Sequence, residues 1–249
     1  MTKHSYIGKV FKTNNYGDVV ITTYINNREV HFRFVDTGYE TKTSLRNIIT
    51  GKIKDRMMPS VYGIGVIGDQ PSRLNNKITK EYTFWSKMLC RCYDYEFRKK
   101  FCTYTDCSVS DNFKYFPYFK DWCHKQVGFN NDKWQLDKDI LIKGNKIYSE
   151  DTCVFVPKEV NMLLCKSNKA RGSSPIGVFW CKKARKYASN CNLGSNTKHL
   201  GFFTTELEAF LVYKQAKERY IKVVANIWKD QIDIRAYEAL MKYEVEITD

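Results

Sequence analysis

Residues 174–203, SPIGVFWCKKARKYASNCNLGSNTKHLGFF, decide the fold of the C-terminal part of the chain. Within them, IGVFWC, KYASNCNL and TKHLGFF alternate as short strands. The next segment, TTELEAFLVYKQAKERYIKVVANIW, has helical spacing, with Thr204 or Thr205 as its cap and Glu208 in its first turn. We therefore predict a three-stranded antiparallel sheet backed by a helix, which packs on it through Leu207, Phe210, Leu211, Val212, Tyr213 and Ala216.

The charge of the chain is concentrated around this sheet. The formal net charge is +14, and residues 166–201 contribute eight basic and no acidic side chains. A basic surface of this kind indicates a polyanionic partner, because each phosphate contact releases counterions. Nucleic acid is the leading candidate and acidic membrane surfaces come second, while a solvated face that binds nothing in particular is the plain alternative.

We expect the face of the sheet opposite the helix to carry the binding residues. A narrow sheet fits the major groove of B-DNA, where lysine and arginine contact guanine and phosphate, and aromatic rings contact sugars and thymine methyls. The candidate DNA-binding residues are Trp180, Lys182, Lys183, Arg185, Lys186, Tyr187, Asn190, Lys198 and His199.

The same segment resembles the ethylene-response-factor (apetala-two) type of DNA-binding domain. The matching residues are Gly177-Val178-Phe179-Trp180, Lys186-Tyr187-Ala188, and the run from Leu200 through Glu206 to Glu208-Ala209 and Tyr213–Ala216. The match covers about 50 residues and is specific. It implies a sheet that faces the DNA groove with a helix behind it.

Residues 134–157, WQLDKDILIKGNKIYSEDTCVFVP, have the layout of a β-hairpin with a Gly-Asn turn, followed by a helix that carries Asn161. This layout resembles the ββα-metal hairpin of HNH nucleases, which in phage and mobile-element proteins often precedes the domain described above. The resemblance implies that Asp137 and Asn161 are ligands of one divalent ion, Mg²⁺ by preference. At the position of the usual catalytic histidine, however, the chain has Lys138.

The replacement of that histidine leaves the general base unaccounted for. Lysine is protonated at neutral pH unless burial lowers its pKa, so Lys138 is expected to be an electrostatic clamp. His124 enters as a base from a neighbouring loop, or is structural. Asp139 is on the same side of the strand as Asp137 and is either a second ligand or an alternative base. Ordinary hairpin chemistry and surface ion pairs explain the same residues without catalysis.

Two functions therefore stay open. One is a homing-type endonuclease or nickase of duplex DNA that uses a divalent metal, and whose catalytic candidates are Lys138, Asp139 and His124. The other is a non-catalytic DNA-binding regulator or counter-defence protein descended from such a nuclease. A third interpretation of the basic face is a host or phage protein with an acidic surface. The resemblance to phage genes implies the cytoplasm of an infected bacterium as the location.

The fold class that we predict is α+β. A β-rich accessory module over residues 1–70 is followed by the HNH-like region with helices over 71–168 and by the DNA-binding domain with a C-terminal helix over 169–249. Residues 1–12, MTKHSYIGKVFK, lack the apolar stretch of a secretory signal, and no segment has the length and apolarity of a membrane span. The segment from Asp230 is an amphipathic helix that packs internally or against a second copy.

Nine cysteines are expected to be mostly buried apolar groups in a reducing compartment. Those near the centre raise the question of zinc, together with His124: Cys90, Cys92, Cys102, Cys107 and Cys123. Only Cys102 and Cys107 approach the loop-like spacing of a zinc site, so zinc is the weaker interpretation.

Overall fold

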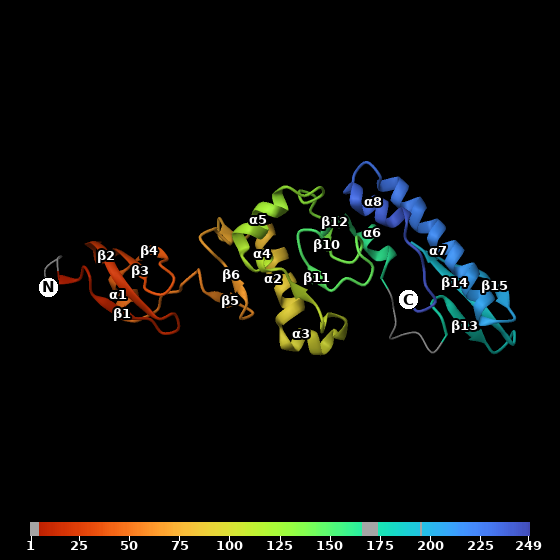
Figure 1. Cartoon of the computed structure of the whole chain (residues 1–249), viewed down its shortest axis with the longest axis horizontal. Helices are drawn as coiled ribbons and strands as arrows, with labels where there is room; N and C mark the ends of the chain where they lie inside the picture. Colours follow the sequence, from red (N-terminus) through yellow and green to blue (C-terminus); the bar gives the residue numbers. More distant parts are fainter. Residues whose placement is uncertain (1–4, 166–173, 195) are drawn as a thin grey trace. The chain divides into compact units, whose positions relative to one another are not determined.

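The computed structural model of the chain describes residues 5–165, 174–194 and 196–249. The chain divides into two compact units, residues 1–121 and 122–249. The division falls inside the region that we assigned to one HNH-like segment. Both units mix helices with antiparallel sheets, so the predicted α+β class is confirmed (Figure 1).

The first unit begins with a four-stranded antiparallel sheet in the order β1-β2-β3-β4. Its strands are β1 (Val10–Lys12), β2 (Asp18–Asn26), β3 (Glu29–Phe34) and β4 (Glu40–Thr43), and the short helix α1 (Leu45–Ile49) follows them. Alternating residues of β2 and β3, such as Ile21, Phe32 and Phe34, are buried in one core with Ile48 of α1. The predicted β-rich module is therefore present, and its strand β4, with the sequence ETKT, has no apolar residue.

The rest of the first unit consists of small hairpins and short helices. Gly63 lies in the turn of the first hairpin with φ +73°, so the glycine-rich stretch around it forms a tight β-turn. Trp85 of α2 is fully buried, and its indole N–H donates to the carbonyl oxygen of Phe113 at 2.7 Å. The elements in order are β5 (Pro59–Val61), β6 (Gly65–Val66), β7 (Arg73–Leu74), β8 (Lys77–Ile78), α2 (Lys80–Tyr93), α3 (Tyr95–Lys100), η2 (Cys102–Tyr104), β9 (Ser108–Val109), α4 (Asp111–Lys114) and α5 (Phe116–His124), whose residues from Trp122 on belong to the second unit.

The second unit contains the hairpin and the C-terminal module. Strands β10 (Trp134–Asp137) and β12 (Val154–Pro157) are antiparallel, and α6 (Lys158–Leu163) follows directly. The short strand β11 (Ile147–Tyr148) lies in the connecting segment. All four residues of β12 are buried, which explains its continuous apolar sequence.

The C-terminal module has the predicted three strands and helix. Strands β13 (Val178–Cys181), β14 (Lys186–Leu193) and β15 (Asn196–Phe203) form an antiparallel sheet with β14 in the centre. Helix α7 (Glu206–Trp228) runs along one face of this sheet (Figure 1). Thr205 caps α7 in a capping box: its hydroxyl oxygen accepts from the backbone N–H of Glu208, and the Glu208 carboxylate accepts from the backbone N–H of Thr205.

The packing face of α7 differs from the predicted one. Phe210 and Tyr213 are buried as expected, but Leu207 and Leu211 are 55% and 48% exposed. The buried stripe continues through Ile221, Val224 and Ala225. Both exposed leucines lie on α7 beside this stripe and not in it. Apolar character alone therefore did not predict which side of α7 the sheet covers.

The C-terminal segment packs internally, which is one of the two arrangements expected for it. Helix α8 (Ile234–Met241) buries Ala236 and Leu240 and contacts α7. The segment after it returns to the sheet side of α7, where Val245 joins the core with Val178 and Tyr213.

Candidate nucleic-acid interface and the hairpin beside it

The register of the C-terminal sheet decides which side chains lie on its two faces. Val178 and Cys191 are buried in the core with residues of α7. Because side chains alternate along a strand, their neighbours in sequence point to the opposite side. The surface opposite α7, called the outer face below, therefore consists of Phe179, Cys181, Lys186, Ala188, Asn190, Asn192, Thr197, His199 and Phe202.

Three of the nine predicted DNA-binding residues lie on the outer face: Lys186, Asn190 and His199. Another three, Lys182, Lys183 and Arg185, are exposed in the turn between β13 and β14. This turn, residues 182–185, is called the basic turn below. Arg185 has φ +50°, a conformation that glycine adopts more easily, so the turn carries an arginine at some cost in backbone strain.

The remaining three candidates do not share the outer face, which corrects the expectation that all nine lie together. Trp180 pairs with Tyr187, and their rings meet edge to face with centroids 4.9 Å apart. Both lie two residues along their strands from the pair Val178–Ser189, so their side chains are on the α7 side of the sheet, where Tyr187 packs against the core. Lys198 is opposite Cys191 and is exposed on the edge strand.

Two exposed aromatic residues of the outer face were missed. Phe179 of β13 and Phe202 of β15 are 46% and 48% exposed. Each is directly opposite Ala188 of the central strand β14. Counting alternate residues from Val178 would have identified Phe179. Phe202 was harder to place, because the extra residue Leu200 shifts the register of β15 between the pairs Ser189–Gly201 and Asn190–His199.

The outer face and the basic turn contain no carboxylate, since residues 178–203 include neither Asp nor Glu. Three of the eight basic residues counted in the sequence, Lys166, Lys169 and Arg171, lie outside the described residues. The described part of this surface nevertheless has four exposed cations and no acidic side chain to neutralise them.

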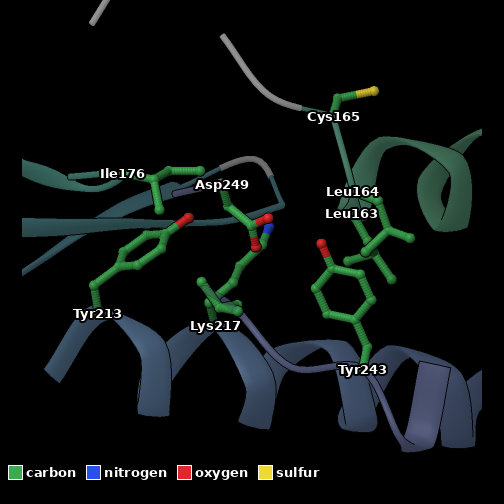
Figure 2. A pocket seen from close by; sticks show the side chains of 9 residues that line it. Leu163, Leu164, Cys165, Ile176, Tyr213, Lys217, Tyr243 and Asp249 are labelled. Atoms are coloured by element: carbon green, nitrogen blue, oxygen red, sulfur yellow. The ribbon is translucent and has the colours of Figure 1, made fainter. Parts of the chain in front are cut away.

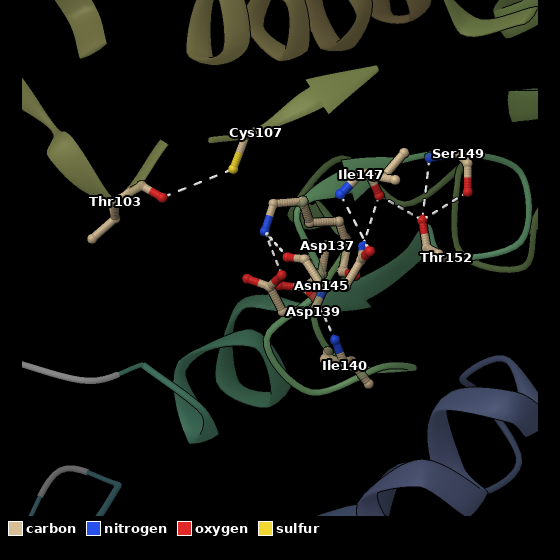
Figure 3. Close-up of polar contacts among 10 residues, drawn as sticks. Thr103, Cys107, Asp137, Asp139, Ile140, Asn145, Ile147, Ser149 and Thr152 are labelled. Atoms are coloured by element: carbon tan, nitrogen blue, oxygen red, sulfur yellow. Dashed lines mark hydrogen bonds and ion pairs between the residues drawn. The ribbon is translucent and has the colours of Figure 1, made fainter. Parts of the chain in front are cut away.

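In the hairpin, the side chain of Asp137 supports the local turn. Its Oδ1 accepts hydrogen bonds from the backbone N–H groups of Asp139 and Ile140 at 2.7 and 2.8 Å (Figure 3). Burial raises the pKa of the Asp137 carboxyl, and these backbone donors oppose the shift. The carboxylate is thus the closing group of an Asx turn at the end of β10.

Lys138 is buried and satisfied by its own loop. Its ammonium donates to the Asp139 carboxylate and, at 2.8 Å, to the carbonyl oxygen of Asn145, and it lies 5.7 Å from the ring centre of Tyr148. The side chain of Asn145 ties the same loop by donating to the carbonyl oxygens of Lys138 and Ile147. Lys138 therefore fills the centre of the loop with a fixed positive charge.

Asn161 lies over the strand face that carries Asp137. Its amide nitrogen donates to the side-chain oxygen of Gln135, which is two residues before Asp137 and so on the same face of β10. Among the described residues, Asp137 Oδ2 and Asn161 Oδ1 have no hydrogen-bonding partner. Two oxygens from protein side chains fit the few ligands that Mg²⁺ takes from a protein, and the ion would neutralise charge on a phosphate.

The general base is the part of the nuclease hypothesis that the residues do not fit. Lys138 is held as a charged donor, and Asp139 is its partner. His124, at the end of α5, is exposed and packs edge to face against Phe129. In the part of the chain that the structure describes, no three His, Cys, Asp or Glu side chains lie close enough together to bind a metal ion. The cysteines considered for zinc are among these residues, and they form no such group.

A small cavity in this unit is lined by residues of α6, α7 and the C-terminal segment, among them Leu163, Tyr213 and Lys217, and by Ile176 before β13 (Figure 2). It encloses about 20 Å³, which is space for one water molecule and none for a substrate. Lys217 has no hydrogen bond or ion pair within the described residues, and burial lowers the pKa of its amine.

Replacing Lys217 with methionine is expected to stabilise the protein at pH 7, on the order of 1 kcal/mol, because an apolar group suits this site better than an unpaired ammonium. The folded-state pKa lies below the unfolded one, so the penalty is full below the folded pKa, shrinks as pH rises above it and is gone above the unfolded pKa. Urea unfolding of both proteins should show a gain that shrinks in alkali. Lys222→Met, at an exposed position of α7, should show no such pH dependence.

In the described ranges, no helix has the combined length and apolarity to cross a membrane. No family model, no curated protein and no solved structure matches the chain, so its function has to be inferred from its own residues.

Proposed function

We propose that the protein binds duplex DNA through the outer face and the basic turn, and that the hairpin is a structural scaffold. One observation carries the proposal: the outer face and the basic turn expose four cations, and the whole of residues 178–203 lacks carboxylates. The cations are Lys182, Lys183, Arg185 and Lys186. Phosphate contacts from such a surface supply affinity through counterion release.

The shape of the surface favours duplex DNA over other polyanions. A three-stranded sheet is narrow enough to enter the major groove, which is about 12 Å wide. The exposed rings of Phe179 and Phe202 lie on the same face as the polar groups of Asn190 and His199. Apolar rings beside hydrogen-bonding groups match base edges, whereas a membrane surface or an acidic protein offers no such regular pattern.

Replacing Lys182 and Lys183 together with alanine is expected to weaken duplex binding about tenfold or more at low salt. The slope of log affinity against log salt concentration should fall by up to about two, because each lost phosphate contact removes about 0.9 from it. Fluorescence anisotropy with a labelled duplex at several salt concentrations measures both quantities.

The matched control is Arg219→Ala with Lys222→Ala, which removes the same charge from exposed positions of α7. It should change affinity and slope much less. A chain that has no affinity for duplexes in dilute buffer, or equal losses for both double variants, would refute the proposal. Binding with a shallow salt dependence would indicate a protein partner instead.

A second candidate, a metal-dependent nickase, is favoured by one observation: Asn161 lies over the face of β10 that carries Asp137. Incubation of supercoiled plasmid with the protein, with and without Mg²⁺, tests it. We expect no metal-dependent relaxed circles, because Lys138 and Asp139 are bound to each other and are not available as the base. Relaxed circles that vanish in the Asp137→Ala/Asn161→Ala variant would establish cleavage and reject the scaffold.

A further inference from the structure

The outer face contains a pair of polar side chains at its centre, Asn190 and His199. They are cross-strand neighbours on β14 and β15, and Asn190 Oδ1 lies 2.9 Å from His199 Nδ1. Neither carries a charged partner among the described residues, and His199 is exposed. The pair is therefore a hydrogen-bonded polar unit on the outer face, where Asn192, Thr197 and the ring of Phe202 are its neighbours on the same two strands.

The hydrogen bond within the pair determines what the pair offers to a ligand. With neutral imidazole, the amide oxygen accepts from Nδ1–H, so Nε2 is left as an acceptor and the amide nitrogen as a donor. If the amide nitrogen donates to Nδ1 instead, Nε2–H is the donor and the amide oxygen the acceptor. Both arrangements present one donor and one acceptor side by side.

We propose that the Asn190–His199 pair, with the adjacent ring of Phe202, makes the protein select A·T base pairs in the major groove. This inference rests on the proposed duplex binding. Adenine presents N7 as an acceptor beside N6–H as a donor, which complements one donor and one acceptor. Guanine presents two neighbouring acceptors, N7 and O6, so one of them would face the acceptor of the pair.

The apolar ring decides between A·T and the remaining alternative. One donor and one acceptor also complement guanine O6 together with cytosine N4–H, so hydrogen bonding by itself does not exclude G·C. The centroid of the Phe202 ring is 4.7 Å from that of His199, and the ring is 48% exposed. Only an A·T pair has a methyl group on this edge for such a ring to contact.

The basic turn has a different role in this arrangement. Lys182 and Lys183 extend from the end of the sheet and carry long flexible ammonium groups, which suit phosphates of any sequence. Their removal is expected to lower affinity for all duplexes alike. Loss of the polar pair is expected to lower affinity for the preferred duplex alone, and this contrast separates positioning from selection.

The experiment is selection by the full chain from duplexes with a randomised centre, followed by binding to the enriched duplex. We expect the enriched sequences to share at least one A·T pair. Asn190→Ala and His199→Ala should each reduce the preference for it over G·C by roughly 5- to 150-fold, the range for a good pair of base contacts. Asn130→Ala, an exposed asparagine outside the sheet, should leave the preference unchanged.

Modified bases test the same contacts without altering the protein. 7-Deazaadenine lacks the N7 acceptor and deoxyuridine lacks the thymine methyl, and each should weaken binding at the selected pair. Phe202→Ala should remove the response to deoxyuridine and keep the response to 7-deazaadenine. The inference fails if the preference persists in both Asn190→Ala and His199→Ala, or if neither modified base has an effect.

The two proposals fail in different ways. Salt-dependent binding without enrichment of any sequence would overturn A·T selection and leave duplex binding intact. Enrichment of G·C pairs at the sensitive position would do the same. Absence of binding to every duplex would overturn both.

Discussion

The Gly177→Ala variant is expected to lose about 3 kcal/mol or more of unfolding free energy in the second unit. Gly177 precedes β13 with φ +78°, a conformation that costs other residues about 1–2 kcal/mol. A Cβ atom there would lie 2.1 Å from Cδ2 of Tyr213, whose side chain is buried under the sheet. Overpacking of a core adds about 1–3 kcal/mol.

Gly144→Ala isolates the backbone part of this loss. Gly144 has φ +77°, and no atom lies within 4 Å of the Cβ that alanine would add. We expect a loss of about 1 kcal/mol for this variant. Urea unfolding followed by tryptophan fluorescence compares the two. Equal losses would mean that Tyr213 is not packed against Gly177, and the core of the module would have to be redrawn.

The second large effect is expected for Asp139→Ala, at about 2–3 kcal/mol. The side chain of Lys138 is 7% exposed and its ammonium has two oxygen partners, the Asp139 carboxylate and the carbonyl oxygen of Asn145. Removing the carboxylate leaves a buried positive charge without its counter-charge, which is costlier than the pair itself is stabilising. Asp230→Ala, at an exposed position, is the matched control and should be near neutral.

Removing the lysine as well is expected to recover part of this loss. In Lys138→Met/Asp139→Ala no charge remains in the loop, and the methionine can lie against the ring of Tyr148. The double variant should be no less stable than Asp139→Ala, as urea unfolding at pH 7 can show. If the losses of the single variants Lys138→Met and Asp139→Ala add up to the loss of the double variant, the two charges do not interact and the scaffold interpretation of Lys138 is wrong.

A coupled loss, in which the double variant is no less stable than Asp139→Ala, would also explain why a lysine is compatible with this position. In the hairpin, the Lys138 ammonium satisfies a carboxylate and a carbonyl oxygen of the same loop. A neutral histidine has only one N–H donor, so it could satisfy only one of these two acceptors. The lysine therefore supports a loop that holds its shape by internal contacts, and this is the behaviour expected of a scaffold.

Much of the fold could be predicted from local pattern. The alternation in residues 178–203 and the helical period after Thr204 predicted β13 to β15 and α7, because these patterns depend on neighbours within a few residues. The capping box of Thr205 and Glu208 is equally local. Leu207 and Leu211 could not be placed, since their exposure depends on which stripe of α7 the sheet covers.

The candidate sites divide in the same way. Sequence by itself determined the presence of a carboxylate-free basic sheet and of a hairpin with Asp137 at the end of its first strand. Tertiary structure alone decided that Trp180 and Tyr187 are in register with the α7 side, that Asn190 meets His199, and that Lys138 is bound by its own loop. The physical reason is that composition and periodicity act between near neighbours, whereas faces and partners depend on strand register, where a single extra residue such as Leu200 changes which side chains meet.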